Sequence, residues 1–246
     1  MLSWLNVLPS TISEDMKDLV KENFERLMPP LLNFIRKGGV KELSPTSDAN
    51  LVKSCMNLMD TLMDEFHDEE KFKTLNEREV ASWLECIFLF SCVWSLGASV
   101  DNDGRNKFNE LFRELLDGPL SLDTKQKFHI LDMVQGPSRP YLCPFPSKGL
   151  VYDYRFIKEG MGKWELWIEE IKDAPPIGKD MQFSEIIIPT IDTVRYTYLV
   201  KQLVEHQKQI LIVGPTGTGK SVYINVSKDT YSLSCYINFD MVHILC

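Results

Sequence analysis

Apolar residues recur every three or four positions through the first half of the chain, the spacing that places them on one face of an α-helix. The two longest runs of this kind cover residues 13–37 and 44–66. Their apolar members are Met16, Leu19, Val20, Phe24, Leu27, Met28, Leu31 and Ile35 in the first run and Leu51, Cys55, Leu58, Met59, Leu62, Met63 and Phe66 in the second. The pattern therefore predicts two amphipathic helices.

Glycine, proline and capping residues indicate where the helices begin and end. We expect the prolines at 29–30 to break or kink the first run and the glycines at 38–39 to end it. Asn76 and Glu79 have the spacing of a capping box, in which each side chain accepts a hydrogen bond from the other residue's backbone N–H. This pair predicts the start of a third helix.

The segment that follows, residues 81–100, is unusually apolar. It approaches the roughly 20 residues needed to cross a bilayer, but Glu85 interrupts it and its strongly apolar part is only 86–96. We therefore predict a buried core helix and no membrane partner. A shorter amphipathic helix is predicted over 107–116, ended by the glycine and proline at 118–119.

The pattern changes after residues 135–150, a proline-rich segment that cannot continue a helix. We interpret this segment as a linker or an extended crossing segment. Beyond it, Trp164, Leu166 and Ile168 occupy alternate positions, which is typical of a β-strand.

A β-branched run at 185–196 is broken by Pro189, and residues 193–207 then return to helical spacing. The residues expected to face inward from this last helix are Tyr196, Leu199, Val200 and Leu203. The apolar run at 210–213 has the length and composition of a buried strand.

Composition narrows the class of protein. The chain of 246 residues is 44% hydrophobic and 25% charged, as in an ordinary globular protein of one large or two modest domains. Its net charge of −8 argues against a general nucleic-acid partner, which requires a basic surface. The six cysteines and four histidines show no metal-ligand spacing, so we expect reduced cysteines in a cytosolic protein.

A glycine-rich loop follows the strand at 210–213 and reads "GPTGTGKS". Glycines let several backbone N–H groups converge on phosphate oxygens, while Lys220 would neutralise the β- and γ-phosphates and the Ser221 hydroxyl would ligate Mg²⁺. The predicted nucleotide-binding residues are Gly214, Pro215, Thr216, Gly217, Thr218, Gly219, Lys220 and Ser221. The predicted cofactors are ATP or ADP with Mg²⁺.

Hydrolysis requires more than this loop, because an acidic residue on a second strand must help to position Mg²⁺ and the attacking water. Asp240 follows Lys220 by 20 residues, which is short for a crossover helix and a strand. We interpret Asp240 as coincidental and predict no catalytic residue in this chain.

The loop and the segments before it resemble the heavy chain of axonemal dynein. The resemblance rests on "GPTGTGKS", on "IPTIDTVRY" at 188–196, and on "FPSKGLVYDYRF" and "WELWIEEI" at 145–156 and 164–171. It covers residues 1–225 and matches the end of the second AAA+ module of the motor ring and the start of the third.

This resemblance implies an α-rich fold, in which a helical lid subdomain precedes the beginning of a P-loop α/β domain that is truncated. Residues 1–134 would be the lid region of the second module and 135–150 a proline-rich linker. Residues 151–226 would be the N-terminal part of the third module, and 227–246 a tail that departs from the family. Ile188, Pro189 and Thr190 would lie in the segment that lines the adenine pocket.

The resemblance also implies a function. In dyneins the third module's nucleotide is regulatory and gates the main ATPase site in the first module, and the whole motor moves toward microtubule minus ends in cilia or flagella. The implied partners are the other heavy-chain modules, intermediate and light chains, and microtubules. The implied location is the cytoplasm and cytoskeleton, in the axoneme.

The sequence departs from that family in lacking the second module's own P-loop, the first module and the microtubule-binding stalk. We therefore expect weak or absent ATP binding by this chain alone and no microtubule-stimulated ATPase. An alternative is a non-enzymatic interaction fragment with a vestigial P-loop. A third, an unrelated P-loop kinase or AAA+ ATPase, is disfavoured by the residues that precede the loop.

Overall fold

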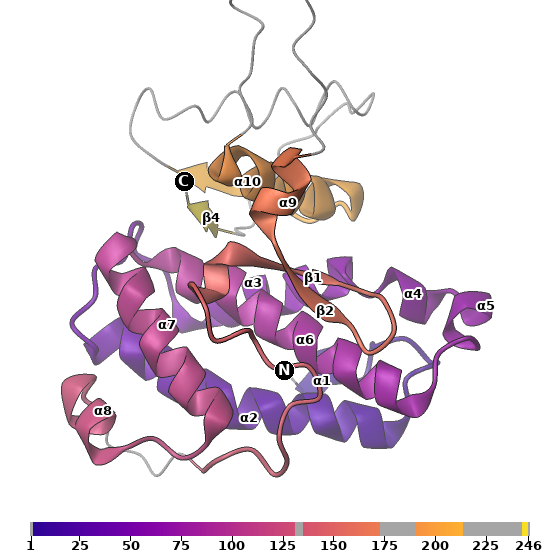
Figure 1. The fold of residues 1–246 in the computed structure, drawn as a ribbon, viewed down its shortest axis with the longest axis horizontal. Helices are drawn as coiled ribbons and strands as arrows, with labels where there is room; N and C mark the ends of the chain where they lie inside the picture. The colour runs from indigo at the N-terminus through magenta and orange to yellow at the C-terminus, as the bar shows by residue number, and fades with distance from the viewer. Residues whose placement is uncertain (1, 131–134, 173–189, 214–242, 246) are drawn as a thin grey trace, which may run out of the picture.

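A computed structural model of the chain describes residues 2–130, 135–172, 190–213 and 243–245. This part of the chain is mostly helical and contains two small two-stranded sheets (Figure 1). The expected α-rich fold, with a helical region that precedes strands, is confirmed.

Residues 2–130 form a bundle of helices. In chain order these are α1 (Leu2–Leu5), α2 (Glu14–Lys37), α3 (Asp48–Thr61), α4 (Asp64–His67), α5 (Glu69–Phe72), α6 (Glu77–Ser95), the 3₁₀ turn η1 (Gly97–Ser99), α7 (Asn102–Asp117) and α8 (Leu122–Lys127). Ser13, Ser47, Asn76 and Asp101 each cap a helix by accepting a hydrogen bond from the backbone N–H three residues on. The predicted capping box between Asn76 and Glu79 is confirmed.

The rest of the described chain adds short strands and two helices. They are the 3₁₀ turn η2 (Val151–Asp153), β1 (Tyr154–Ile157), β2 (Lys163–Leu166), α9 (Trp167–Lys172), α10 (Ile191–Glu205), β3 (Leu211–Val213) and β4 (His243–Leu245). β1 and β2 pair antiparallel, with Tyr154 opposite Leu166. Figure 1 shows α9, α10 and β4 together on one side of the helical bundle.

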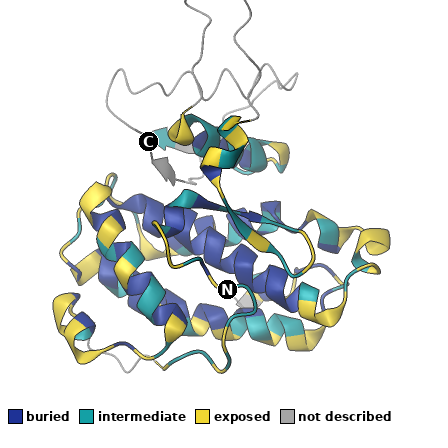
Figure 2. Cartoon of the chain, in the orientation of Figure 1, coloured by how far each residue is buried: buried dark blue, intermediate teal, exposed yellow. Residues whose placement is uncertain are grey.

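α6 is the central helix of the bundle, and Figure 2 shows it dark blue along most of its length. Residues 80–95 are all buried, because α2, α3 and β1 contact this helix. By length and composition alone α6 with η1 would suffice to cross a membrane, but its apolar window is entirely buried in the fold. The predicted core helix is therefore confirmed.

α2 continues through the two prolines at 29–30, so the predicted break does not occur. Each proline removes a backbone N–H and disfavours the helix locally. Leu27 and Leu31, one on each side of the pair, are nevertheless 0% exposed, so both halves of the helix are held on the same core. Tertiary packing outweighs the local preference. The helix ends at Gly38, as predicted.

The second amphipathic run is confirmed as helical but is divided between α3 and α4. The division falls at Leu62 and Met63, where α3 ends and its last backbone N–H groups turn back onto preceding carbonyls. All seven apolar positions of the run are buried. The helical spacing therefore identified the buried face correctly, although not the break.

The strand predicted through Ile168 is wrong beyond Leu166, where β2 ends and α9 begins. Leu166 and Ile168 are 37% and 38% exposed, whereas Trp167 between them is fully buried. The Trp167 ring lies edge-on to Trp94 of α6, with ring centroids 6.3 Å apart. The burial of this large side chain against α6 decides the local conformation, and the alternating pattern did not reveal it.

Residues 135–150, here called the proline-rich strap, are an extended segment packed on the bundle. The Arg139 guanidinium lies 2.8 Å from the buried Glu85 carboxylate, and the Leu142 backbone N–H donates to the same carboxylate at 3.2 Å. Burial raises the pKa of Glu85, and these two partners oppose that rise. The predicted domain boundaries at residues 134 and 150 stay a prediction. The packing of the strap on the helical bundle is the observation that bears on them.

Candidate nucleotide-binding site

The predicted phosphate loop, residues 214–221, lies outside the described residues, as do Ile188, Pro189 and Asp240. The predicted role of each of these residues therefore stays a prediction. The structure does describe the strand that enters the loop and the helix that precedes this strand. These two elements determine where the loop starts.

β3 ends at Val213, directly before Gly214. The predicted strand is confirmed over Leu211–Val213, and it pairs in parallel with β4, with Leu211 opposite His243. β4 in turn contacts α10, α6 and η1. Loops at the carboxyl edge of parallel strands are where α/β domains bind ligands, so the first residue of the glycine-rich loop lies at a suitable edge.

Thr190 is the described member of the predicted adenine-pocket segment, and it caps α10. Its hydroxyl accepts a hydrogen bond from the Thr193 backbone N–H at 3.1 Å and lies 2.8 Å from the Thr193 hydroxyl. Thr190 is also exposed. The structure thus gives Thr190 a helix-capping role, and a contact with adenine stays a prediction.

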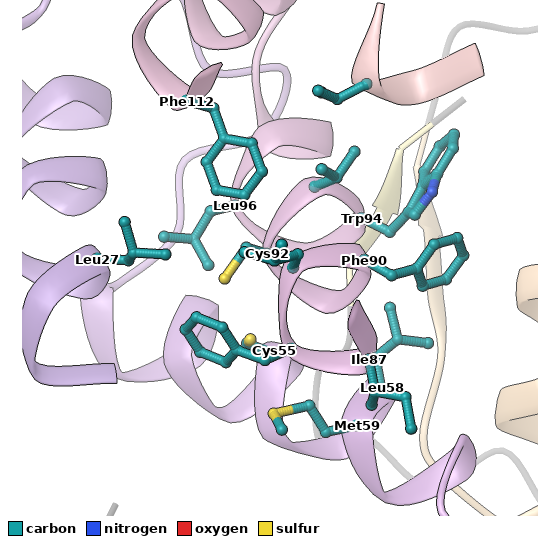
Figure 3. Close-up of a cluster of buried hydrophobic side chains, with 14 of the residues drawn as sticks. Leu27, Cys55, Leu58, Met59, Ile87, Phe90, Cys92, Trp94, Leu96 and Phe112 are labelled. Carbon is teal, nitrogen blue, oxygen red and sulfur yellow. The ribbon is translucent and has the colours of Figure 1, made fainter. Parts of the chain in front are cut away.

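α10 is confirmed as predicted, with Tyr196, Leu199, Val200 and Leu203 buried. A cluster of aromatic rings joins it to α6 and α9. Trp167 lies 5.3 Å from Tyr198, and Trp94 lies 6.2 Å from Tyr196, both in edge-to-face geometry. Figure 3 shows Phe90 and Trp94 projecting from the same side of α6, away from Cys92 and Leu96. Such pairs add to the energy of burial.

Sequence reasoning missed this aromatic cluster as the support for the loop. A signal was present, because Trp94 lies in the strongly apolar segment 86–96 and Trp167 lies in one of the motifs that carry the family resemblance. Arg195 adds a cationic contact, with its guanidinium 5.5 Å from the Trp94 ring centroid. The spacing of residues within one helix or strand does not show which aromatic rings from distant parts of the sequence will contact each other.

Two polar contacts fix the C-terminal end of α10 to the helical bundle. His206 Nε2 lies 2.8 Å from the Asp64 carboxylate, and Lys208 Nζ lies 2.7 Å from the Asp60 carboxylate. Partial burial lowers the pKa of His206, but the hydrogen bonds to Asp64 and to the Gln202 carbonyl outweigh it, so the pKa is raised overall. The charged imidazolium is therefore the form that this contact stabilises.

A pH dependence of stability follows from the raised pKa of His206. Its contribution should be fully present below the unfolded-state pKa of about 6.5 and should be lost as pH rises through the higher folded-state pKa. Because His206 is partly exposed, we expect less than about 1 kcal/mol between pH 6 and 8. Urea unfolding of the wild type and of His206→Gln at several pH values measures this pH-dependent difference in stability.

His67 provides the control for that series, because it is an exposed histidine on α4. His67→Gln should leave the pH dependence of the wild type unchanged, whereas His206→Gln should flatten it. An equal pH dependence in the His206→Gln variant would contradict the role assigned to this contact.

Within the described part of the chain no cluster of histidine, cysteine or acidic residues has the arrangement of a metal site. Cys55, Cys86, Cys92 and Cys143 are free thiols there. Any Mg²⁺ that accompanies a nucleotide would be held mainly by the nucleotide's phosphates and by an oxygen ligand such as the Ser221 hydroxyl, a donor set that fits this ion.

Two protein-family models match the chain. One, the dynein heavy chain AAA lid domain, matches residues 20–169. The other, the P-loop containing dynein motor region, matches residues 175–242. The second match includes the glycine-rich loop at 214–221 and runs past residue 226, where we expected the resemblance to end.

Several curated dynein heavy chains are similar to this chain. Dynein axonemal heavy chain 3 of Homo sapiens is 35% identical over 254 residues, covering 96% of this chain and 6% of that protein. Dynein axonemal heavy chain 12 of Mus musculus is 34% identical over 252 residues, covering 96% and 7%. Dynein axonemal heavy chain 2 of Mus musculus is 31% identical over 219 residues, covering 89% and 4%.

The chain therefore spans only 4–7% of the length of these relatives. The lid-domain match alone covers more than half of the chain, and the helices that it includes form the described bundle. On this basis the chain belongs to the dynein heavy chain family, as a segment of the motor region that joins an AAA lid domain to a P-loop region.

Proposed function

We propose that this chain supplies the phosphate loop of a regulatory ATP site, at the start of the third AAA+ module of an axonemal dynein motor ring. The observation that carries the proposal is the P-loop motor-region match over 175–242, which contains "GPTGTGKS". The axonemal relatives at 31–35% identity support the axonemal type.

In this proposal Gly214, Gly217 and Gly219 shape the loop so that backbone N–H groups converge on the phosphates. Lys220 neutralises the β- and γ-phosphates, and Ser221 ligates Mg²⁺. Ile188, Pro189 and Thr190 border the adenine. No residue of this chain is assigned a catalytic role.

The packing of α10 supports a regulatory nucleotide site that is coupled to the lid, rather than a site that acts independently of it. α10 lies directly before β3, and β3 enters the loop. The aromatic cluster and the Asp64 and Asp60 contacts attach α10 to the lid helices. A movement of the loop on nucleotide binding would therefore be transmitted to the lid, through elements that pack against each other.

The wider role follows from the family. We propose that residues 1–134 act as the lid of the second module and that 135–150 connect it to the third module, which begins at 151. Because the motor-region match runs to residue 242, we extend this third-module segment past 226 into the predicted tail. The complete motor would act on microtubules in the cilium or flagellum axoneme, together with intermediate and light chains. This segment would gate the motor's main ATPase site.

Nucleotide titration tests the phosphate loop. We expect the chain to bind Mg-ATP weakly, with a dissociation constant of about 1 mM, which corresponds to roughly −4 kcal/mol. Lys220→Ala should weaken this binding by about tenfold or more, because it removes the charge that faces the phosphates. Isothermal titration calorimetry or ligand-observed NMR measures the difference.

Lys53→Ala is the matched control, since Lys53 is an exposed lysine on α3 in the lid. It should bind as the wild type does. Equal binding by Lys220→Ala and the wild type would contradict the proposed phosphate loop. Absence of binding up to about 10 mM, which corresponds to a binding free energy weaker than roughly −3 kcal/mol, would favour the alternative of an interaction fragment with a vestigial loop.

A further inference from the structure

The fold brings together two cysteines that lie 57 positions apart in the sequence. Cys86 belongs to α6 and Cys143 to the proline-rich strap. The Cys86 thiol donates a hydrogen bond to the backbone carbonyl oxygen of Cys143 at 3.6 Å, so the two residues are in direct contact. Neither thiol is used by the proposed nucleotide site.

We propose that Cys86 and Cys143 form an oxidant-sensitive thiol pair, whose disulfide fastens the proline-rich strap to the central helix of the lid. In reducing cellular compartments free thiols form disulfides transiently, and such disulfides act in redox sensing rather than as permanent structural bonds. The pair requires two properties beyond proximity, namely access for the oxidant at one sulfur and a protected partner at the other.

The two environments differ in the required way. Cys143 is half-buried, whereas Cys86 is 1% exposed, so Cys143 is the more accessible residue of the two. The neighbouring Cys86 thiol lowers the pKa of Cys143, and burial raises the pKa of Cys86 well above its usual range. Cys143 is therefore the thiol that forms the nucleophilic thiolate, and Cys86 is the resolving thiol.

The chemistry balances with hydrogen peroxide as the oxidant. The Cys143 thiolate attacks one peroxide oxygen, the O–O bond breaks, and a sulfenic acid and hydroxide form, the latter taking up a proton to give water. The Cys86 sulfur then attacks the sulfenic sulfur, the S–O bond breaks, and a second water leaves with the Cys86 proton. Two thiols are thereby oxidised by two electrons and one peroxide is reduced to two waters.

Oxidation would act on the part of the fold that connects the lid to the β1–β2 hairpin. The Cys143 carbonyl accepts a hydrogen bond from Trp164 Nε1 of β2 at 2.9 Å, and the Cys143 thiol lies 3.3 Å from the Gly162 carbonyl. A covalent link at Cys143 therefore restrains both the strap and the hairpin, which leads directly into α9 and Trp167.

A second pair of thiols serves as an internal comparison. Cys55 of α3 and Cys92 of α6 are also neighbours in the core, but both are 0% exposed. Figure 3 shows both side chains inside the hydrophobic cluster. Burial raises the pKa of Cys92 well above its usual range. These two thiols lie close together but are inaccessible to an oxidant in solution, so we expect them to stay reduced.

Peroxide treatment followed by peptide mapping tests the proposal. The protein is the 246-residue chain with Cys235→Ser and Cys246→Ser, which removes the two cysteines outside the described residues. We expect a disulfide between Cys86 and Cys143, reversed by dithiothreitol, while Cys55 and Cys92 stay reduced. With Cys86→Ser, Cys143 should instead accumulate as a sulfenic acid that dimedone traps.

Cys92→Ser is the control and should oxidise as its parent does, because it leaves the proposed pair intact. Cys143→Ser should abolish the disulfide and leave Cys86 reduced. The proposal is overturned if Cys143 stays reduced, if it is oxidised without a link to Cys86, or if Cys55 and Cys92 link at the same rate.

Hydrogen exchange reports the consequence for the strap. The backbone amides of Tyr141, Leu142, Cys143 and Phe145 should exchange roughly tenfold more slowly after oxidation, since opening of the strap then requires a larger part of the lid to open. The same treatment of Cys143→Ser should leave their exchange rates unchanged. Equal rates in the oxidised and reduced parent would show that the disulfide does not fasten the strap.

Discussion

Leu27→Ala should lower the free energy of unfolding by about 3–5 kcal/mol, the range found for leucines deleted from well-packed cores. Leu27 is 0% exposed in the middle of α2, and Figure 3 shows its side chain pointing toward Leu96 at the end of α6. The neighbouring helices are fixed by their other contacts, so they are expected to leave a cavity rather than close it. Chemical denaturation followed by circular dichroism measures the loss.

Leu122→Ala makes the same chemical change at a position where no cavity can form. Leu122 begins α8 and is 78% exposed, so its truncation should change stability by less than about 0.5 kcal/mol. If the two alanine variants lost similar stability, the central position of α2 in the core would be wrong. We expect only Leu27→Ala to lose a large part of the free energy of unfolding, a third or more of that of a typical domain.

Gly97→Ala should destabilise the fold by about 1–3 kcal/mol through overpacking. A Cβ atom at Gly97 would lie 2.6 Å from the Tyr152 hydroxyl and 2.7 Å from the Phe108 ring. Both aromatic side chains are fully buried, and the Tyr152 hydroxyl donates a hydrogen bond to the Gly97 carbonyl at 2.8 Å. Neither ring can move aside without disturbing other contacts, so the strain is expected to persist.

Gly118→Ala is the matched control, because a Cβ atom there meets nothing within 4 Å and the backbone is extended. Its effect should lie within about 0.5 kcal/mol of the wild type, with stabilisation the favoured sign because alanine restricts the unfolded chain. Thermal unfolding of both variants under the same conditions gives the comparison. A Gly97→Ala protein as stable as Gly118→Ala would contradict the close packing of η1 against η2 and α7.

Much of the helical part of this protein could be predicted from the sequence because its signals are local. The apolar spacing identified the buried faces of α2, α3 and α10, and Asn76 with Glu79 identified the start of α6. The long apolar segment was correctly predicted as a core helix from its length and from Glu85. These features depend on residues three or four positions apart, which a single helix brings together.

The errors have one physical cause, which is contact between residues far apart in the sequence. Local rules predicted a break at the prolines of α2 and a strand through Ile168, but packing against α6 prevails at both places. The candidate nucleotide-binding site shows the same contrast between local and long-range signals. The loop motif was readable from spacing, whereas the rings that hold α10 beside it come from α6, α9 and α10 together.

The sequence by itself determined the helical faces, the caps and the family resemblance to axonemal dynein, because each depends on residue types at fixed short spacing. Only the tertiary structure decided that the strap folds back onto Glu85, that Trp167 forms a helix rather than a strand, and that Cys86 meets Cys143. Those outcomes depend on burial and on partners tens of residues away, and their free energy appears only when the whole core assembles.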